Sequence, residues 1–182
     1  YPYRPAAEAP PTVSNITPFY NTGDVFAETA RSVFGQSFQE WEWVIVDDGS
    51  TEAEAVERLA AVERSDTRIR IVRQANRGPS AARNAAFSAS RGRYLCLLDS
   101  DDLIEPTFIE KTVWFLESHP QFGFCNSWTV HFDEARFLWK AGFERGRKFL
   151  QGNSGPPIAV VRREAYQASG GFDESIVFGH ED

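Results

Sequence analysis

The stretch that decides the fold is Leu97-Leu98-Asp99-Ser100-Asp101-Asp102, in which an apolar run ends abruptly in three carboxylates. The nearest cations along the sequence are Arg93, on the far side of the expected strand, and Lys111. Because neither lies close, we expect a divalent metal ion to balance the negative charge. Hard cations such as Mg²⁺ and Mn²⁺ take oxygen ligands, and Mg²⁺ uses one or two protein carboxylates, the others coming from water and substrate phosphates. The stretch therefore predicts a metal site for a phosphorylated substrate.

A second apolar run ends in the same way. Trp43-Val44-Ile45-Val46-Asp47-Asp48-Gly49-Ser50-Thr51 is rich in β-branched residues, then has paired Asp, Gly for a tight turn, and Ser/Thr for a helix start. In the alternative interpretation, Asp99 and Asp101 are merely turn residues and Asp102 caps a helix. Two acidic strand ends favour a binding site instead, since parallel strands place such turns along one edge of an α/β sheet.

Composition narrows the class of protein. The chain has 182 residues, 42% hydrophobic and 25% charged, which suits one compact domain with a sizeable core. Its net charge of −7, without a basic cluster, argues against nucleic acid or an anionic membrane as the main partner. No window reaches the about 18 consecutive apolar residues of a membrane span, and the first residues lack a signal peptide's apolar core. We expect a cytoplasmic protein that would reach the inner face of a membrane only through segments outside this one.

The two cysteines, Cys96 and Cys125, lie in apolar, strand-like runs without the spacing of metal ligands. They are expected to be reduced core residues of a cytosolic protein. A disulfide between them is the alternative.

Apolar periodicity predicts strands that alternate with helices after a Pro-rich linker or arm at residues 1–12. Thr51 and Glu54 form a capping box, and Pro79 and Pro106 suit helix starts. Small residues after Pro79 should let that helix pack close to the sheet. The order predicts a Rossmann-like, doubly wound, mostly parallel sheet. The expected strands cover residues 13–17, 42–47, 69–72 and 94–98, and the expected helices cover residues 23–36, 51–64, 79–92 and 106–118.

The pattern changes after residue 120. Residues 122–132 and 137–143 are aromatic and partly alternating, which predicts antiparallel strands added to the edge of the sheet. A further strand at 158–161 and a short helix at 162–168 follow. The chain stops at Asp182 without a closing element, so we expect a domain truncated at its C-terminus.

Six motifs, in this order, resemble those of family 2 glycosyltransferases, and the match covers nearly everything after residue 12. They are Val13-Ser14-Asn15-Ile16-Thr17-Pro18-Phe19-Tyr20-Asn21, Val46-Asp47-Asp48-Gly49-Ser50-Thr51, Asn76-Arg77-Gly78-Pro79-Ser80-Ala81-Ala82-Arg83-Asn84, Leu98-Asp99-Ser100-Asp101-Asp102, Gly170-Gly171-Phe172-Asp173-Glu174 and His180-Glu181-Asp182.

The resemblance implies the glycosyltransferase A fold, a nucleotide-diphosphate-sugar donor, Mn²⁺ or Mg²⁺, and transfer with inversion at the anomeric carbon. It implies a catalytic domain at residues 13–182, with a nucleotide-sugar-binding half at 13–102 and an acceptor-side half at 103–182. The acceptor would be a carbohydrate, a lipid-linked molecule or a protein.

Carried across by position, the resemblance places Pro18 and Tyr20 at the edge of the nucleotide pocket, with Tyr20 near the base. Asp48 would accept a hydrogen bond from the uracil imide N–H, which favours a UDP-sugar, and Arg83 would contact the nucleotide or the diphosphate. The alternatives are a half-buried core phenol for Tyr20 and a turn or N-cap role for Asp48. Arg77 could help, but an exposed loop arginine is more often solvated.

The same resemblance assigns the acidic residues. Asp99 and Asp101 match the family's Asp-x-Asp pair around Ser100, with Asp99 near the ribose and Asp101 on the metal. Asp102 either approaches the metal instead or caps the following helix. Asp182 matches the general base, which must accept the proton of the acceptor hydroxyl as the new bond forms, because its reference pKa is about 3.9.

Three features stay open. Trp128 and Trp139 either stack on a sugar ring or belong to the core, the usual place of an aromatic stripe. His180 is either a partner of the base or incidental. Residues 153–157 lie where the family lines its acceptor site, and no single residue is assigned there.

Two rival functions share part of the pattern. A phospho-accepting receiver domain also has an acidic pair after one strand and an Asp after another, but it begins with the strand that carries the pair. It also needs a Lys at a later strand end, and Lys140 and Lys148 lie in the wrong kind of segment. A nucleotidyltransferase of similar fold would have a Gly-rich, basic loop after the first strand, and Thr17-Pro18-Phe19-Tyr20-Asn21 is neither.

Overall fold

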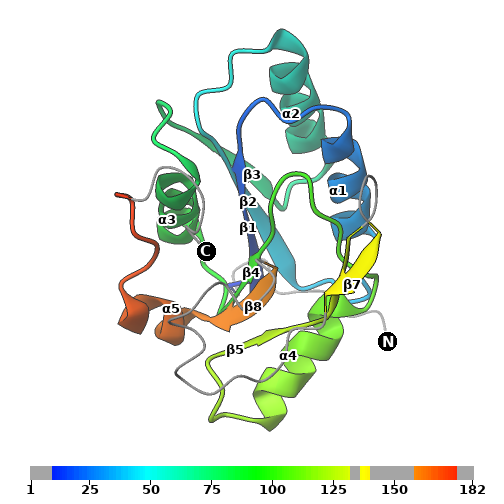
Figure 1. Cartoon of the computed structure of the whole chain (residues 1–182), viewed down its shortest axis with the longest axis vertical. Helices are drawn as coiled ribbons and strands as arrows, with labels where there is room; N and C mark the ends of the chain where they lie inside the picture. The colour runs from blue at the N-terminus through cyan, green and yellow to red at the C-terminus, as the bar shows by residue number, and fades with distance from the viewer. Residues whose placement is uncertain (1–9, 132–135, 140–157, 176–182) are drawn as a thin grey trace.

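The computed structural model describes residues 10–131, 136–139 and 158–175 (Figure 1). Its strands are β1 Val13–Phe19, β2 Trp41–Asp47, β3 Ile69–Arg73, β4 Tyr94–Leu97, β5 Phe124–Asn126, β6 Thr129–His131, β7 Phe137–Trp139 and β8 Ala159–Arg162. Its helices are α1 Val25–Phe34, α2 Ala53–Ser65, α3 Pro79–Ala89, α4 Phe108–Ser118 and α5 Arg163–Ser169.

Within the described ranges, six strands form one sheet in the order β3-β2-β1-β4-β8-β5. β1 runs parallel to β2 and β4, and β2 runs parallel to β3. Buried residues of α1, α2 and α4 share one core on one face, whereas α3 packs against the opposite face (Figure 1). On that face, Ala82 and Ala86 are fully buried against Ile16 and Val44, as the small residues of this helix predict. The doubly wound, mostly parallel sheet is therefore confirmed.

The added strands are arranged differently from the sequence-based expectation. β8, which follows all the others in the chain, lies between β4 and β5 and is antiparallel to both. β6 and β7 pair with each other in a separate two-stranded sheet, so the prediction that they extend the main sheet is wrong. Trp128, between β5 and β6, is 60% exposed and so is not a core residue. Among the described strands, β5 is the outermost on this side of the main sheet.

The position of β8 separates the two cysteines. Cys96 on β4 and Cys125 on β5 both face Val160 of β8, from opposite sides. Their Cα atoms are therefore two strand spacings apart, about 10 Å, which is beyond the span of a disulfide. Both thiols are free, and burial raises the pKa of Cys96 to about 12. The expectation of cysteines that form no disulfide with each other is confirmed, with Cys96 in the core and Cys125 only partly buried against it.

The N-terminus of α2 is capped from another part of the chain. The predicted capping box is wrong, because the helix begins at Ala53 and no side chain of its own N-cap residue caps it. Instead, the side-chain oxygen of Asn21 accepts from the backbone N–H groups of Thr51 and Glu52, at 2.8 and 3.0 Å. Asn21 has a φ of 48°, in the left-handed region that asparagine tolerates better than most residues. The end of β1 is thereby fixed to the start of α2.

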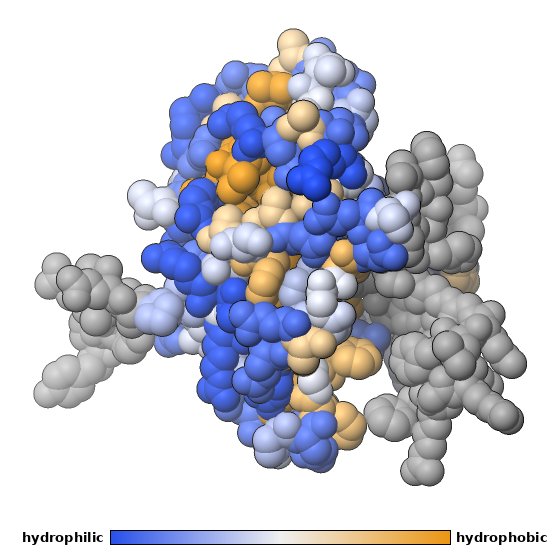
Figure 2. Space-filling model, turned by 90° about the vertical axis from the view of Figure 1, so that its left-hand side faces the viewer, coloured by the Kyte–Doolittle hydropathy of each residue, from blue (hydrophilic) through white to orange (hydrophobic). Residues whose placement is uncertain are grey.

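The search for a membrane-spanning helix and the character of the surface bear on the expectations drawn from composition. Among them, no helix combines the length and the apolar character needed to cross a bilayer. The side of the molecule that carries α3 and α5 is mostly hydrophilic, with some apolar side chains showing in its upper half (Figure 2). Several residues weighed in the sequence analysis lie outside the described residues: nearly all of the Pro-rich arm, Lys140, Lys148, residues 153–157, His180 and Asp182.

Candidate functional site

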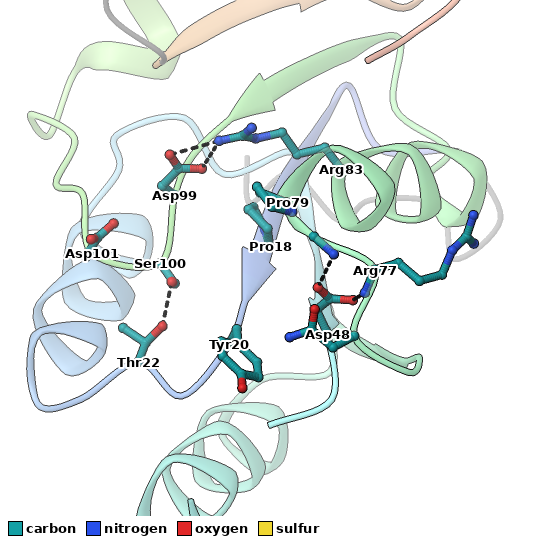
Figure 3. Close-up of a pocket in the computed structure, with 12 residues that line it drawn as sticks. Pro18, Tyr20, Thr22, Asp48, Arg77, Pro79, Arg83, Asp99, Ser100 and Asp101 are labelled. Atoms are coloured by element: carbon teal, nitrogen blue, oxygen red, sulfur yellow. Dashed lines mark hydrogen bonds and ion pairs between the residues drawn. The ribbon is translucent and has the colours of Figure 1, made fainter. Parts of the chain in front are cut away.

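A pocket of about 710 Å³ lies at the carboxyl ends of β1, β2 and β4 (Figure 3). The strand order reverses between β1 and β4, which is where open α/β sheets form their ligand crevice. The structure brings seven of the predicted site residues together around this pocket: Pro18, Tyr20, Asp48, Arg83, Asp99, Ser100 and Asp101.

β1 delivers Pro18 and Tyr20 to the pocket. The backbone oxygen of Ile16 accepts from Leu98 N–H, so the backbone of Ile16 faces β4. Two residues later, the backbone nitrogen of Pro18 points to that same side of β1. β4 ends at Leu97, opposite Ile16, and the missing N–H of Pro18 therefore leaves no strand bond unmade. Tyr20 is 51% exposed and lies between Thr22 and Asp48 (Figure 3). Tyr20 is therefore half exposed at the pocket and does not belong to the buried core.

Asp48 is a buried carboxylate held by the loop before α3. One oxygen accepts from Gln74 Nε2 at 2.7 Å and from the Arg77 backbone N–H at 2.9 Å; the other accepts from Gly78 N–H at 2.8 Å. A carboxylate has about four lone-pair sites, so about one acceptor position remains for a ligand. Because α2 begins at Ala53, the N-cap alternative for Asp48 is wrong.

Glycine lets the two loops approach this closely. Gly49 has a φ of 79°, and a Cβ there would lie 2.9 Å from the backbone nitrogen of Asn76. The paired Asp and Gly after β2 therefore do more than make a turn. They dock the loop at residues 74–78 against the end of β2.

Asp99 is neutralised by an arginine that is distant in sequence. Nη2 of Arg83 on α3 donates to both carboxylate oxygens, at 2.8 and 3.0 Å (Figure 3). The Arg83 side chain is 6% exposed, and its guanidinium carbon lies 5.1 Å from the ring centre of Phe172. Asp99 therefore has a cationic partner, contrary to the expectation from the sequence, because folding brings Arg83 to it from 16 residues away.

The turn that follows β4 is fixed through Ser100. Its hydroxyl lies 2.7 Å from that of Thr22, and its carbonyl accepts from Thr29 of α1 at 3.0 Å. Asp101 next to it is exposed and lines the pocket. α4 begins only at Phe108, so Asp102 does not cap that helix.

The acidic residues fit a divalent cation. The described part of the chain contains no group of three or more Asp, Glu, His or Cys side chains that could hold a metal. Mg²⁺ nevertheless needs only one or two protein carboxylates when phosphate and water complete its shell, and the carboxylates of Asp99 and Asp101 meet that need. Since Arg83 already engages both oxygens of Asp99, Asp101 would be the better placed of the two to bind such an ion.

Sequence reasoning missed several lining residues. Thr22, Asn76, Gly78 and Pro79 also face the pocket, and so does Arg77, for which a solvated loop position was the favoured interpretation. Gly78 has a φ of 89° immediately before the first helical residue of α3. The Gly-Pro pair could have signalled this, because such a helix start presents backbone N–H groups to an anion.

Comparison with known proteins agrees with this geometry. The family model "Glycosyl transferase family 2" matches residues 14–168. The putative teichuronic acid biosynthesis glycosyltransferase TuaG of Bacillus subtilis is 42% identical over 107 residues, which are 58% of this chain and 42% of TuaG.

Solved structures share the fold at low sequence identity. S. aureus TarS residues 1–349 in complex with UDP-GlcNAc superimposes with a TM-score of 0.74 at 21% identity, covering 89% of this chain and 48% of that one. The mannosyltransferase PcManGT of Pyrobaculum calidifontis, in complex with GDP-Man and Mn²⁺, gives 0.69 at 20% identity, covering 93% and 49%.

This chain spans about half the length of those structures, or somewhat less of TuaG. The expected glycosyltransferase A fold is confirmed, and the receiver and nucleotidyltransferase interpretations lose their support. With a family model that matches most of its length, the chain belongs to glycosyl transferase family 2.

Proposed function

We propose that this protein transfers a sugar from a UDP-sugar to an acceptor hydroxyl, with inversion and with a divalent metal. The observation that carries the proposal is the single pocket that holds Asp48 at one end and the Asp99–Asp101 turn at the other. A nucleoside diphosphate has the matching layout, with a base that donates a hydrogen bond at one end and a diphosphate at the other. The pocket residues lie between positions 18 and 101, which supports assigning donor binding to residues 13–102.

At the base end, the remaining acceptor position of Asp48 favours uracil. Uracil presents one ring N–H, whereas the guanine edge presents a ring N–H and an amino group that would need two acceptor positions. Three positions of Asp48 are already used by Gln74, Arg77 and Gly78. The exposed ring of Tyr20 beside it offers a stacking surface for the base. The TarS structures solved with UDP and with UDP-GlcNAc support a uridine donor.

At the diphosphate end, Asp101 would hold Mn²⁺ or Mg²⁺ and Asp99 would lie near the ribose. Such a metal, when bound, stabilises the charge that builds on the leaving diphosphate. Arg83 adds a guanidinium group held beside Asp99, and the N-terminus of α3 adds backbone N–H groups. The PcManGT structure with Mn²⁺ supports a metal at this kind of site.

For the transfer step, we assign the general base to Asp182 from the Glu-Asp motif. Its carboxylate would take the proton of the acceptor hydroxyl as that oxygen attacks the anomeric carbon from the face opposite the diphosphate. A single in-line displacement of this kind inverts the anomeric configuration. The name of TuaG supports an acceptor that belongs to teichuronic acid biosynthesis. We place the reaction in the cytoplasm, as the lack of a signal-peptide pattern led us to expect.

The test is sugar transfer from UDP-glucose and UDP-GlcNAc, measured as UDP release with Mn²⁺ and a panel of carbohydrate and lipid-linked acceptors. We expect acceptor-dependent release with at least one donor, and NMR of the product should show the inverted anomer. Asp182→Asn serves as the matched control, since it should release little UDP while still binding it. A retained anomeric configuration, or release that is the same in EDTA, would contradict the proposal.

A further inference from the structure

Asn84, the residue after Arg83 on α3, uses its whole side-chain amide on one distant segment. Its Nδ2 donates to the Phe172 carbonyl at 3.0 Å and to Glu174 Oε1 at 2.9 Å. Its Oδ1 accepts from the Phe172 N–H at 3.0 Å and from the Tyr166 hydroxyl at 2.8 Å. An asparagine amide has two donor hydrogens and two acceptor lone pairs, so all four are in use. The pocket described above does not account for this arrangement.

The segment is shaped to fit Asn84. Gly170 and Gly171 have φ values of 85° and 80°, and a Cβ on Gly171 would lie 2.7 Å from the Asn84 oxygen. Burial raises the pKa of Tyr166 to about 12, so its phenol stays protonated and can donate. We call residues 170–174 the glycine turn. It is held against α3 by hydrogen bonds that reach across more than 80 residues of sequence.

The glycine turn also touches the side chains that serve the pocket. The Phe172 ring lies 5.1 Å from the guanidinium carbon of Arg83, the residue that bonds both oxygens of Asp99. Glu174 forms an ion pair with Arg77 at 2.6 Å, and the backbone N–H of Arg77 bonds Asp48. The glycine turn thus contacts Arg83, the arginine that the proposed donor would meet.

We infer that Asn84 is a positioning residue for donor binding: it fixes the glycine turn so that Phe172 holds the Arg83 guanidinium in place beside Asp99. An arginine pre-set in this way loses less side-chain freedom when an anion binds, because its orientation is determined beforehand. This inference rests on the proposed function, since it assumes that a nucleoside diphosphate meets Arg83. It assigns to Asn84 no contact with the ligand.

The test is a double-mutant cycle on UDP affinity, measured by calorimetry with Mn²⁺. Asn84→Ala should weaken UDP binding by about 10-fold, and Arg83→Lys should weaken it as well. Asn84→Ala should then have little further effect in the Arg83→Lys protein, because lysine lacks the planar group that Phe172 orients. Ser88→Ala is the matched control. Ser88 donates only to the backbone carbonyl of Asn84 within α3, so this variant should bind UDP normally.

A second variant guards against misfolding of Asn84→Ala. Phe172→Leu removes the ring from Arg83 and leaves the backbone groups that Asn84 bonds, so it should reproduce the loss of UDP affinity and be non-additive with Asn84→Ala. Losses that simply add in the Arg83→Lys protein would show a general structural role and overturn the inference. Normal UDP binding by both Asn84→Ala and Phe172→Leu would overturn it too, while leaving the proposed function intact. If the unsubstituted protein does not bind UDP, the proposed function fails and the inference fails with it.

Discussion

At the residue scale, the pocket combines side chains fixed by the fold with side chains that face solvent. Asp48 is 3% exposed and Arg83 5% exposed, and each is held by bonds that cross between elements. Tyr20 and Asp101, in contrast, are exposed at the pocket. Substitutions of the exposed pair should therefore change ligand binding with little change in stability, whereas substitutions of the buried pair would confound the two.

Replacing the Tyr20 ring tests its role in binding the base. Tyr20→Leu should weaken UDP binding by about 1 to 3 kcal/mol, the usual contribution of stacking a base on an aromatic ring. The free energy of unfolding should stay within about 0.5 kcal/mol, because the side chain is half exposed. Calorimetry and urea unfolding check the two parts. Trp114→Leu is the control, since Trp114 is 67% exposed on α4 and does not line the pocket; an equal loss of affinity there would refute the specific role of Tyr20.

Replacing Asp101 tests the metal assignment. Asp101→Asn exchanges an anionic ligand for a neutral amide, so Mn²⁺-dependent UDP binding should become at least about 10-fold weaker. Asp102→Asn should bind UDP normally, because Asp102 does not line the pocket. Titration of UDP in the presence of Mn²⁺ measures both variants. The opposite result, with Asp102→Asn defective and Asp101→Asn normal, would move the metal assignment to Asp102.

At the element scale, helix α2 depends on Asn21 for its N-terminal cap. Asn21→Ala removes the acceptor for two backbone N–H groups. It also places alanine at a φ of 48°, a left-handed conformation that asparagine tolerates better. The loss in the free energy of unfolding should be about 1 to 2 kcal/mol, measured in urea. Thr51→Ala, which removes the hydroxyl of the capping box that the sequence suggests, should lose clearly less. A larger loss in Thr51→Ala would show that the helix is capped locally after all.

The opposite end of the sheet provides a pH-dependent test. Glu42 of β2 accepts from the Ser14 hydroxyl at 2.7 Å and from the backbone and side chain of Arg91. Although burial raises the pKa of Glu42, these hydrogen bonds and the Arg91 charge outweigh it and hold that pKa below the ordinary value of 4.5. The carboxylate therefore contributes stability above about pH 4.5, and this contribution is lost as the pH falls through the lower, folded-state pKa.

Glu42→Gln measures that contribution. Near neutral pH the variant should be less stable by about 1 to 3 kcal/mol, because an amide cannot accept at both of the former oxygen positions. The difference from the unsubstituted protein should shrink as the pH falls from neutral through the folded-state pKa of Glu42, which lies below 4.5, because the wild-type carboxyl then becomes protonated. Urea unfolding at neutral and at low pH gives the answer. A difference that stays the same at low pH would show that packing, and not the charge, is responsible.

At the scale of the whole molecule, the apolar periodicity of the sequence predicted the features that depend on short stretches of chain. The alternation of strands and helices up to Ser118, and the gathering of acidic turns at one sheet edge, follow from periodicity and from the geometry of parallel strands. The expected bounds of these strands and helices differ from the observed ones by a few residues at most. The family resemblance then predicted seven residues that line a single pocket.

Contacts between distant parts of the chain could not be predicted in this way. The pairing of Arg83 with Asp99 needs the packing of α3 against the sheet, and the capping of α2 by Asn21 needs the approach of two loops. The insertion of β8 between β4 and β5 is a choice among strand orders that a short apolar run does not specify. Each of these features is decided by tertiary packing and not by propensity.

The central claim, a metal-dependent uridine-diphosphate site at this pocket, is tested most directly by thermal unfolding in the presence of nucleotides. A ligand that binds the native state raises the apparent stability, by about 2.7 kcal/mol at 100 times its Kd. UDP and dTDP share a ring N–H that would donate to Asp48 in the proposed binding mode. They should raise the unfolding temperature more than GDP or CMP, and only when Mn²⁺ or Mg²⁺ is present. Equal shifts in EDTA, or a shift with CMP as large as that with UDP, would contradict this account.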